Sequence, residues 1–85
     1  MGQSPADLTF EAEDLGAMEH TLEVVEKLMA FLRHDSAVVR EGAILGAARH
    51  MEGAFGGRLK ARLHVMGASD PHPAVRELVS DILDS

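Results

Sequence analysis

Histidine is the residue type in this chain best suited to chemistry, because a neutral imidazole binds metals and exchanges protons near neutral pH. The chain has five histidines: His20, His34, His50, His64 and His72. No two are four residues apart, and none stands near a carboxylate at a spacing specific for metal ligands. The sequence therefore predicts surface or interface histidines and no metal site. Two of them, His34 and His72, belong to successive predicted turns and are the pair expected to approach one another.

Catalysis by a nucleophile or by paired carboxylates requires a shaped cleft, and a chain of 85 residues has little material for one. The serines have simpler roles as helix caps, turn residues or tail residues: Ser4, Ser36, Ser69, Ser80 and Ser85. The glycine-rich stretch 53–57 lacks the Lys-Ser or Lys-Thr that follows in a phosphate-binding loop. We therefore expect no enzyme, no catalytic residue and no cofactor.

Length and composition favour one all-α domain spanning residues 1–85. Hydrophobic residues make up 46% of the chain, and aliphatic side chains and methionine dominate over three phenylalanines, which suits helix packing better than a sheet. There is no cysteine and no apolar run near the roughly 20 residues that span a bilayer, so we expect a soluble, cytoplasmic protein without disulfides or membrane contact. A domain this small buries only about 60–65% of its unfolded surface, which favours oligomerisation or partner binding.

The net charge of −6 is unevenly distributed. Residues 1–26 hold seven acidic side chains and no Lys or Arg, residues 27–62 are predominantly basic, and the C-terminal part is acidic again. Two interpretations are open. The charges form solvated faces with pairing inside the molecule, or an acidic surface of one subunit meets a basic surface of another.

An apolar seam with alternating spacings of three and four predicts one long amphipathic helix over about residues 11–33. Its members are Leu15, Met18, Leu22, Val25, Met29 and Leu32. Residues 1–14 are expected to be an acidic, partly irregular N-terminal extension. Either Ser4 caps a helix that begins at Pro5, or Leu8 to Phe10 form an extended lead-in and Thr9 caps the helix proper. We favour the second.

Three more helices are predicted, over about 37–51, 58–68 and 73–83. The first of these carries Gly42 and Gly46, each of which costs roughly 1 kcal/mol relative to alanine inside a helix. Such a cost indicates close approach by another helix, so this segment should be the central helix. Paired glycines end it, and Pro73 begins the last helix.

The sequence contains an internal repeat. Val39-Arg40-Glu41 recurs as Val75-Arg76-Glu77, 36 residues later. The run 70–77 resembles the inter-helix signature of HEAT repeats, and residues 32–43 resemble a common variant of it. The resemblance covers about residues 19–85 and implies a short α-α superhelix of two antiparallel helix pairs, 15–52 and 57–85, with about four helices.

In HEAT repeats an aspartate in the turn and an arginine early in the second helix form polar ladders between stacked units. Asp70 and Arg76 match these positions in the second unit. In the first unit Arg40 matches, while His34 stands at the aspartate position with Asp35 beside it. The resemblance therefore implies inter-repeat polar contacts among Asp35, Arg40, Asp70 and Arg76.

For function, the resemblance implies a non-enzymatic protein–protein interaction or assembly module whose partner the sequence does not specify. Stacked units bury their apolar faces against neighbours, and two units leave both ends open. We therefore expect self-association through an end face, formed either by the long first helix or by the last helix, where Val79, Ile82 and Leu83 are candidate interface residues. The alternative is nucleic-acid binding by the basic segment 27–62, which the acidic balance and the absence of Tyr and Trp argue against.

Overall fold

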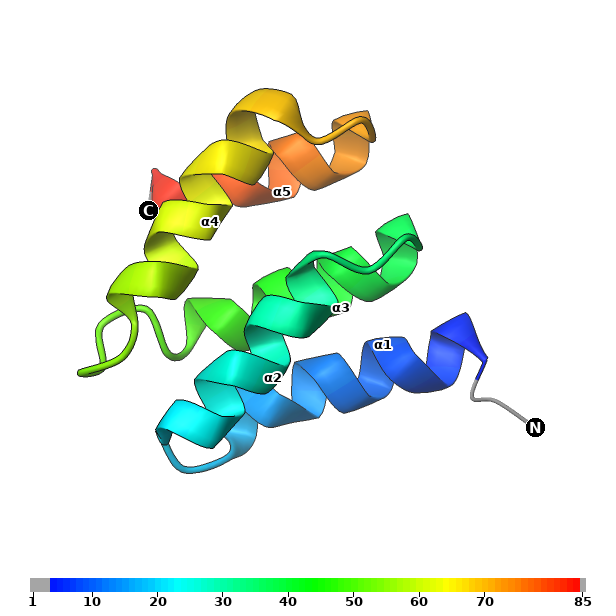
Figure 1. Cartoon of the computed structure of the whole chain (residues 1–85). Coiled ribbons are helices and arrows are strands. Elements are labelled where there is room, and N and C mark those ends of the chain that lie inside the picture. Colours follow the sequence, from blue (N-terminus) through cyan, green and yellow to red (C-terminus); the bar gives the residue numbers. More distant parts are fainter. Residues whose placement is uncertain (1–3, 85) are drawn as a thin grey trace.

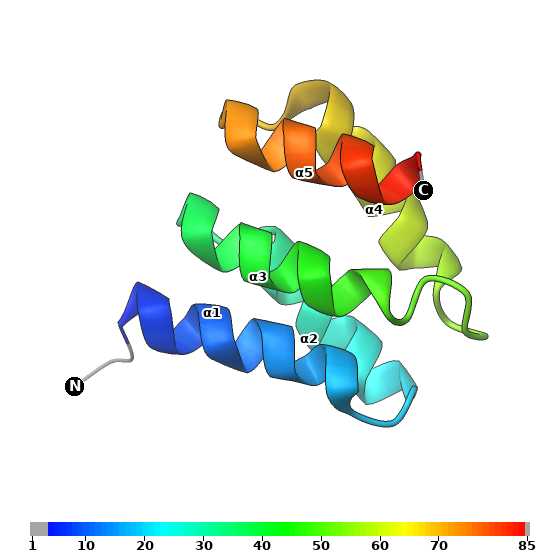
Figure 2. The same cartoon turned by 180° about the vertical axis from the view of Figure 1, so that it is seen from behind.

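The computed structural model describes residues 4–84, and within this range the chain is all-helical without strands. The helices are α1 (Pro5–Asp14), α2 (Leu22–Leu32), α3 (Ala37–Ala48), α4 (Gly57–Ser69) and α5 (Pro73–Leu83), with a short 3-10 turn, η1 (Leu15–Ala17), after α1. Helices α1, α3 and α5 stack in one layer, and α2 and α4 form the second layer (Figures 1 and 2). The resulting slab measures 36 × 30 × 16 Å.

The predicted long helix over residues 11–33 is wrong. The chain leaves the helical conformation after η1, with extended backbone at Met18 and Thr21, and α2 starts afresh. The Thr21 hydroxyl caps α2 by accepting a hydrogen bond from the backbone N–H of Val24 at 3.1 Å. Met18 and Leu22, two members of the predicted seam, are 53% and 43% exposed. Because the chain turns between α1 and α2, both helices pack against α3. A single straight helix over residues 11–33 could not place both of its halves against α3.

The N-terminal extension is also more regular than predicted, because α1 begins at Pro5. The Ser4 hydroxyl accepts a hydrogen bond from the backbone N–H of Asp7 at 3.2 Å, and Pro5 occupies the first helical position. Thr9 is an interior residue of α1, and its hydroxyl donates to the carbonyl of Pro5 at 2.7 Å. The alternative that we did not favour is therefore the one that the chain adopts, and the fold has five α-helices within residues 4–84.

Helix α3 is the central helix, as predicted, since it contacts α1, α2 and α5. Its glycines mark the closest approach. A Cβ atom at Gly42 would lie 2.6 Å from the carbonyl oxygen of Thr9, and one at Gly46 would lie 2.4 Å from that of Ala12. The predicted close approach by another helix is confirmed, and the approaching helix is α1. The helix itself ends at Ala48, three residues earlier than predicted.

The core lies between the two layers. It joins side chains from every helix, and most of them are fully buried: Ala12, Leu15, Val24, Val25, Leu28, Leu32, Ala43, Ile44, Ala47, Leu59, Leu63, Met66, Val75 and Val79. One of these, Val79, was a candidate interface residue, and its burial removes it from the accessible surface. Ile82 and Leu83 are half-buried and pack against the core from the outer end of α5.

Candidate functional site

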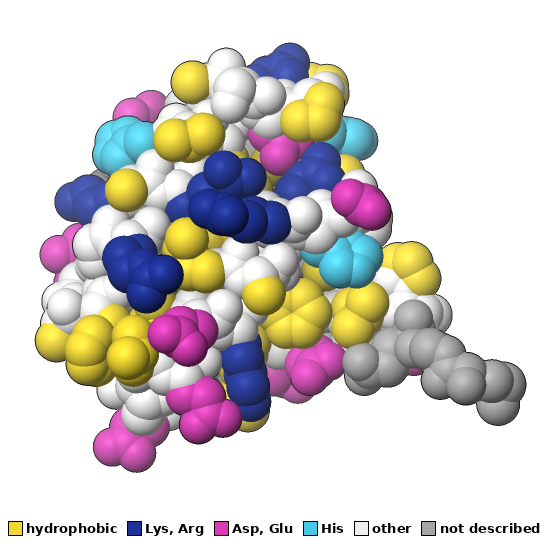
Figure 3. Space-filling model, in the orientation of Figure 1, with side chains coloured by type: hydrophobic (Ala, Val, Ile, Leu, Met, Phe, Trp, Pro, Cys, Tyr) yellow, Lys and Arg dark blue, Asp and Glu magenta, His cyan; other side chains and the backbone are white. Residues whose placement is uncertain are grey.

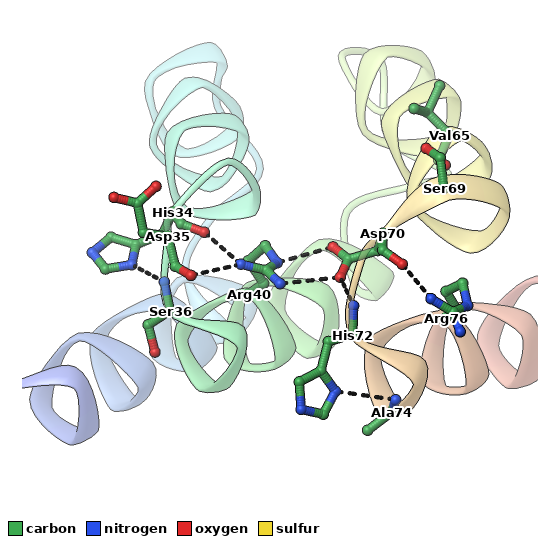
Figure 4. Close-up of polar contacts among 10 residues, drawn as sticks. All are labelled: His34, Asp35, Ser36, Arg40, Val65, Ser69, Asp70, His72, Ala74 and Arg76. Carbon is green, nitrogen blue, oxygen red and sulfur yellow. Dashed lines mark hydrogen bonds and ion pairs between the residues drawn. The ribbon is translucent and has the colours of Figure 1, made fainter.

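The turn between α2 and α3 and the turn between α4 and α5 have two hydrogen bonds in common (Figure 4). In the first, His34 Nδ1 accepts from the backbone N–H of Ser36 at 3.0 Å, and Arg40 Nη1 donates to the His34 carbonyl at 2.9 Å. In the second, an Asp70 carboxylate oxygen accepts from the backbone N–H of His72 at 2.9 Å, and Arg76 Nη1 donates to the Asp70 carbonyl. The side chain at the first position of each turn thus caps the backbone two residues later.

The two turns are joined by a bidentate ion pair. Arg40 Nε and Nη2 donate to the two carboxylate oxygens of Asp70 at 2.9 and 3.0 Å, and the side chains are 11% and 5% exposed. Arg40 Nη1 also donates to the carbonyl of Asp35 at 2.9 Å, so all three nitrogen atoms of the guanidinium donate hydrogen bonds. Of the four residues with predicted polar contacts, Arg40 and Asp70 meet side chain to side chain, whereas Asp35 takes part only through its backbone and Arg76 only bonds the Asp70 carbonyl.

The ion pair sets the ionisation of Asp70. Burial on its own would raise the pKa of this carboxyl, but the hydrogen bond and charge of Arg40, with the backbone N–H of His72, outweigh burial and hold the pKa below its usual value. Asp70 is therefore a carboxylate at neutral pH, and the ion pair joins α3 to the turn between α4 and α5.

Directly beside this link lies an open hollow on the face formed by α2 and α4, which we call the arginine hollow. Its volume is about 380 Å³, and it is lined by Met29, Arg33, Arg58, Ala61, Arg62 and Val65. Figure 3 shows basic side chains gathered near the centre of this face, with hydrophobic ones next to them. Arg33 and Arg62 also line a second hollow, of about 290 Å³, that reaches Arg40 and Asp70.

The arginines of the hollow lack internal partners. Within residues 4–84 neither a hydrogen bond nor an ion pair joins Arg33, Arg58 or Arg62 to another side chain. The Nε atom of Arg62 is shielded from solvent without a hydrogen-bond acceptor. A buried donor without a partner costs about 1–3 kcal/mol. Three guanidinium groups with free donors around an open hollow form a site suited to an anionic ligand.

The sequence did not predict that Arg33, Arg58 and Arg62 line one hollow, although it places two of them on one helix face. Arg58 and Arg62 are four residues apart on one helix face, which the sequence shows. Arg33, at the end of α2, joins them only because α2 and α4 lie side by side (Figure 1). The other four cations of the basic segment do not line this hollow. Arg40 is buried with Asp70, and Arg49 lines a separate hollow with Glu13 and Leu45. Lys27 forms an exposed ion pair with Glu23, and Lys60 is exposed on α4.

A histidine pair that the sequence did not predict lies at the opposite end of α3. His20 Nδ1 and His50 Nδ1 are 3.0 Å apart, and the rings stack with centroids separated by 5.2 Å. His50 Nε2 lies 2.8 Å from the carbonyl oxygen of Leu15, and His20 Nε2 accepts from the backbone N–H of Phe55 at 3.0 Å. His34 and His72, the predicted pair, instead each bond the backbone of their own turn.

The partners of the His20–His50 pair fix both tautomers. A carbonyl only accepts, so His50 carries its hydrogen on Nε2; a backbone N–H only donates, so His20 carries its hydrogen on Nδ1 and donates to His50. We expect nitrogen-15 NMR spectra at pH 8 to show the Nδ1–H form for His20 and the Nε2–H form for His50. The exposed His64, for comparison, should exchange between both forms. The Nε2–H form at His20 would contradict the hydrogen-bond chain.

Two general properties bear on the choice among functions. No helix within residues 4–84 is long and apolar enough to cross a membrane. Over the same residues, no group of three or more His, Asp or Glu side chains is arranged to hold a metal ion. Comparison of the chain with protein-family models, curated proteins and solved structures gives no match.

Proposed function

We propose that the chain is a short HEAT-like repeat with two helix pairs, α2–α3 and α4–α5, and that α1 covers the open side of α3. The support is the 36-residue period together with two hydrogen bonds that recur at the two turns. The side chains of His34 and Asp70 each accept from the backbone N–H two residues later, and Arg40 and Arg76 donate to the carbonyls of His34 and Asp70, respectively. The Arg40–Asp70 pair holds one unit in register with the next. Repeats of this kind serve as rigid frames for surfaces that bind other proteins.

We propose that the protein is a non-enzymatic interaction or assembly module and that it binds through the arginine hollow. The observation that carries the proposal is the set of three guanidinium groups without internal partners around this hollow. Arginine stays protonated in proteins, so the hollow is equipped to hold an anion and not to move a proton. Met29 and Val65 add apolar contact area, and Val65 is 51% exposed. Acidic side chains flanked by apolar ones on another protein match this composition.

Nucleic-acid binding is the second candidate, because the hollow brings together three cations of segment 27–62. Phosphate backbones require a continuous positive field. Here Arg40 is neutralised by Asp70, and the chain has a net charge of −6. The distribution of charge therefore favours a protein partner.

The experiment is affinity capture with the immobilised full chain from an extract of cells that produce it. We expect wild type to retain a protein that the R58E/R62E variant loses, because the reversal repels an acidic partner. The matched control is K27E/K60E, which makes the same change of charge at residues that do not line the hollow. Equal retention by all three chains would contradict binding through the hollow, and capture that nuclease treatment abolishes would favour the second candidate.

A further inference from the structure

The outer face of α1 carries carboxylates, which are the counter-charges that the guanidinium groups of the arginine hollow lack. Asp7, Glu11 and Asp14 recur at spacings of four and three, so they share one stripe of the helix, and all three are exposed. Phe10 lies in the same stripe and is 65% exposed. Within residues 4–84 none of these carboxylates is hydrogen-bonded or ion-paired through its side chain. We call Asp7, Phe10, Glu11 and Asp14 the acidic stripe.

The stripe is directed away from its own molecule. The opposite side of α1, with Ala12 buried, packs against α3. The hollow is lined by residues of α2 and α4 and by Arg33 at the end of α2. These two helices form the other layer (Figures 1 and 2). The stripe of one molecule therefore cannot enter its own hollow, and only another molecule can supply the contact.

The spacing of the carboxylates along the acidic stripe matches the spacing of the arginines on α4. Arg58 and Arg62 are one helical turn apart on α4, with side chains roughly 5–6 Å apart at their bases. Neighbouring carboxylates of the stripe are likewise one turn apart on α1. Phe10, between them, matches the apolar side chains that border the hollow, Met29 and Val65.

We propose that the arginine hollow binds the acidic stripe of a second copy of this chain, so that the protein assembles through repeated α1-to-hollow contacts. This inference rests on the proposed function and names its partner. An acceptor from the stripe would satisfy the shielded Nε of Arg62 and give the three guanidinium groups their carboxylates. Because the two surfaces differ, the contact is heterologous, and copies join head to tail.

The net charge of −6 on each copy does not prevent this contact. At 0.1 M salt the Debye length is about 10 Å, so distant like charges are largely screened while ion pairs in contact are not. Raising the salt from 0.1 to 0.5 M should weaken the contact, because it then screens the pairs themselves.

The test is sedimentation velocity of the full-length chain over a range of concentrations, with two charge reversals. R58E/R62E makes the hollow acidic, and E11R/D14R makes the stripe basic. Wild type should sediment faster as concentration rises. Each variant alone should stay monomeric, with an apparent Kd raised about a hundredfold or more by juxtaposed like charges. A mixture of the two variants should associate again, because every contact in it then joins opposite charges.

The controls carry equal charge changes elsewhere: K27E/K60E for the hollow, and E52R/E77R, at two exposed glutamates, for the stripe. Both should associate like wild type, and circular dichroism should show the same helix content for all variants. Wild type that is monomeric throughout, or a mixture that stays monomeric, would overturn the inference. If wild type is monomeric and the hollow still captures another protein, the inference fails while the proposed function stands; if it captures nothing, both fail.

Discussion

Replacing Asp70 by asparagine is expected to lower the free energy of unfolding at pH 7 by about 3 kcal/mol, because it leaves the buried guanidinium of Arg40 without its counter-charge. The asparagine keeps the size of the side chain and can still accept the hydrogen bond from the backbone N–H of His72. The loss of unfolding free energy therefore measures the contribution of the negative charge and of the second acceptor oxygen. Urea denaturation followed by circular dichroism measures it. A change below about 0.5 kcal/mol would contradict the role of the ion pair in holding α3 to the turn between α4 and α5.

Asp81→Asn is the matched control, since Asp81 is an exposed carboxylate on α5 and its change should stay within about 0.5 kcal/mol. Adding Arg40→Met to Asp70→Asn should cost less than the sum of the two single changes, because the charge left uncompensated in one variant is absent from the double variant. Additive losses would show that the two side chains act independently.

The pH dependence follows from the lowered pKa of Asp70. A carboxyl whose pKa is lower in the folded than in the unfolded state contributes stability above the unfolded value of about 4, and this contribution disappears as the pH falls through the folded value. The difference in the free energy of unfolding between wild type and Asp70→Asn should therefore be constant from pH 7 to 5 and become smaller below about pH 4. A difference that becomes smaller between pH 7 and 5 would mean that another group is responsible.

Replacing Gly46 by alanine is expected to destabilise the protein by about 2–3 kcal/mol, although alanine is the better helix former. The added Cβ would lie 2.4 Å from the carbonyl oxygen of Ala12 and 3.0 Å from a methyl group of Leu28. The first of these contacts is with backbone, which a side-chain rotation cannot relieve, so α1 must move away from α3. Urea denaturation measures the free energy of unfolding. Relative to wild type, amide hydrogen exchange should become faster in α1 by more than in α4 or α5.

Gly57→Ala is the control, because a Cβ at Gly57, the first residue of α4, meets nothing within 4 Å. This substitution should be neutral or stabilise the protein by up to about 1 kcal/mol. If Gly46→Ala behaved like Gly57→Ala, the close packing of α1 on α3 would be wrong.

The sequence predicted those features that depend on neighbours along the chain. The last helix has the bounds that Pro73 and the apolar spacing indicate, and Gly42 and Gly46 correctly marked a close helix approach. The main error came from the same kind of pattern. The seam over residues 11–33 keeps its helical spacing across a turn, since periodicity records which residues are apolar and not whether the backbone between them continues.

Sequence alone thus predicted that the chain is helical and that the triplet Val-Arg-Glu recurs after 36 residues, at the start of two helices, because spacing, capping residues and prolines act locally. Only the tertiary structure decided which groups from distant segments meet. The resemblance named Arg40 and Asp70 among four residues with polar contacts, and the structure shows that these two pair directly. The contact of His20 with His50, and the approach of Arg33 to the two arginines of α4, were not predicted. Such contacts depend on how helices stack and where the chain turns back, and local preferences do not encode either with enough precision to place a side chain.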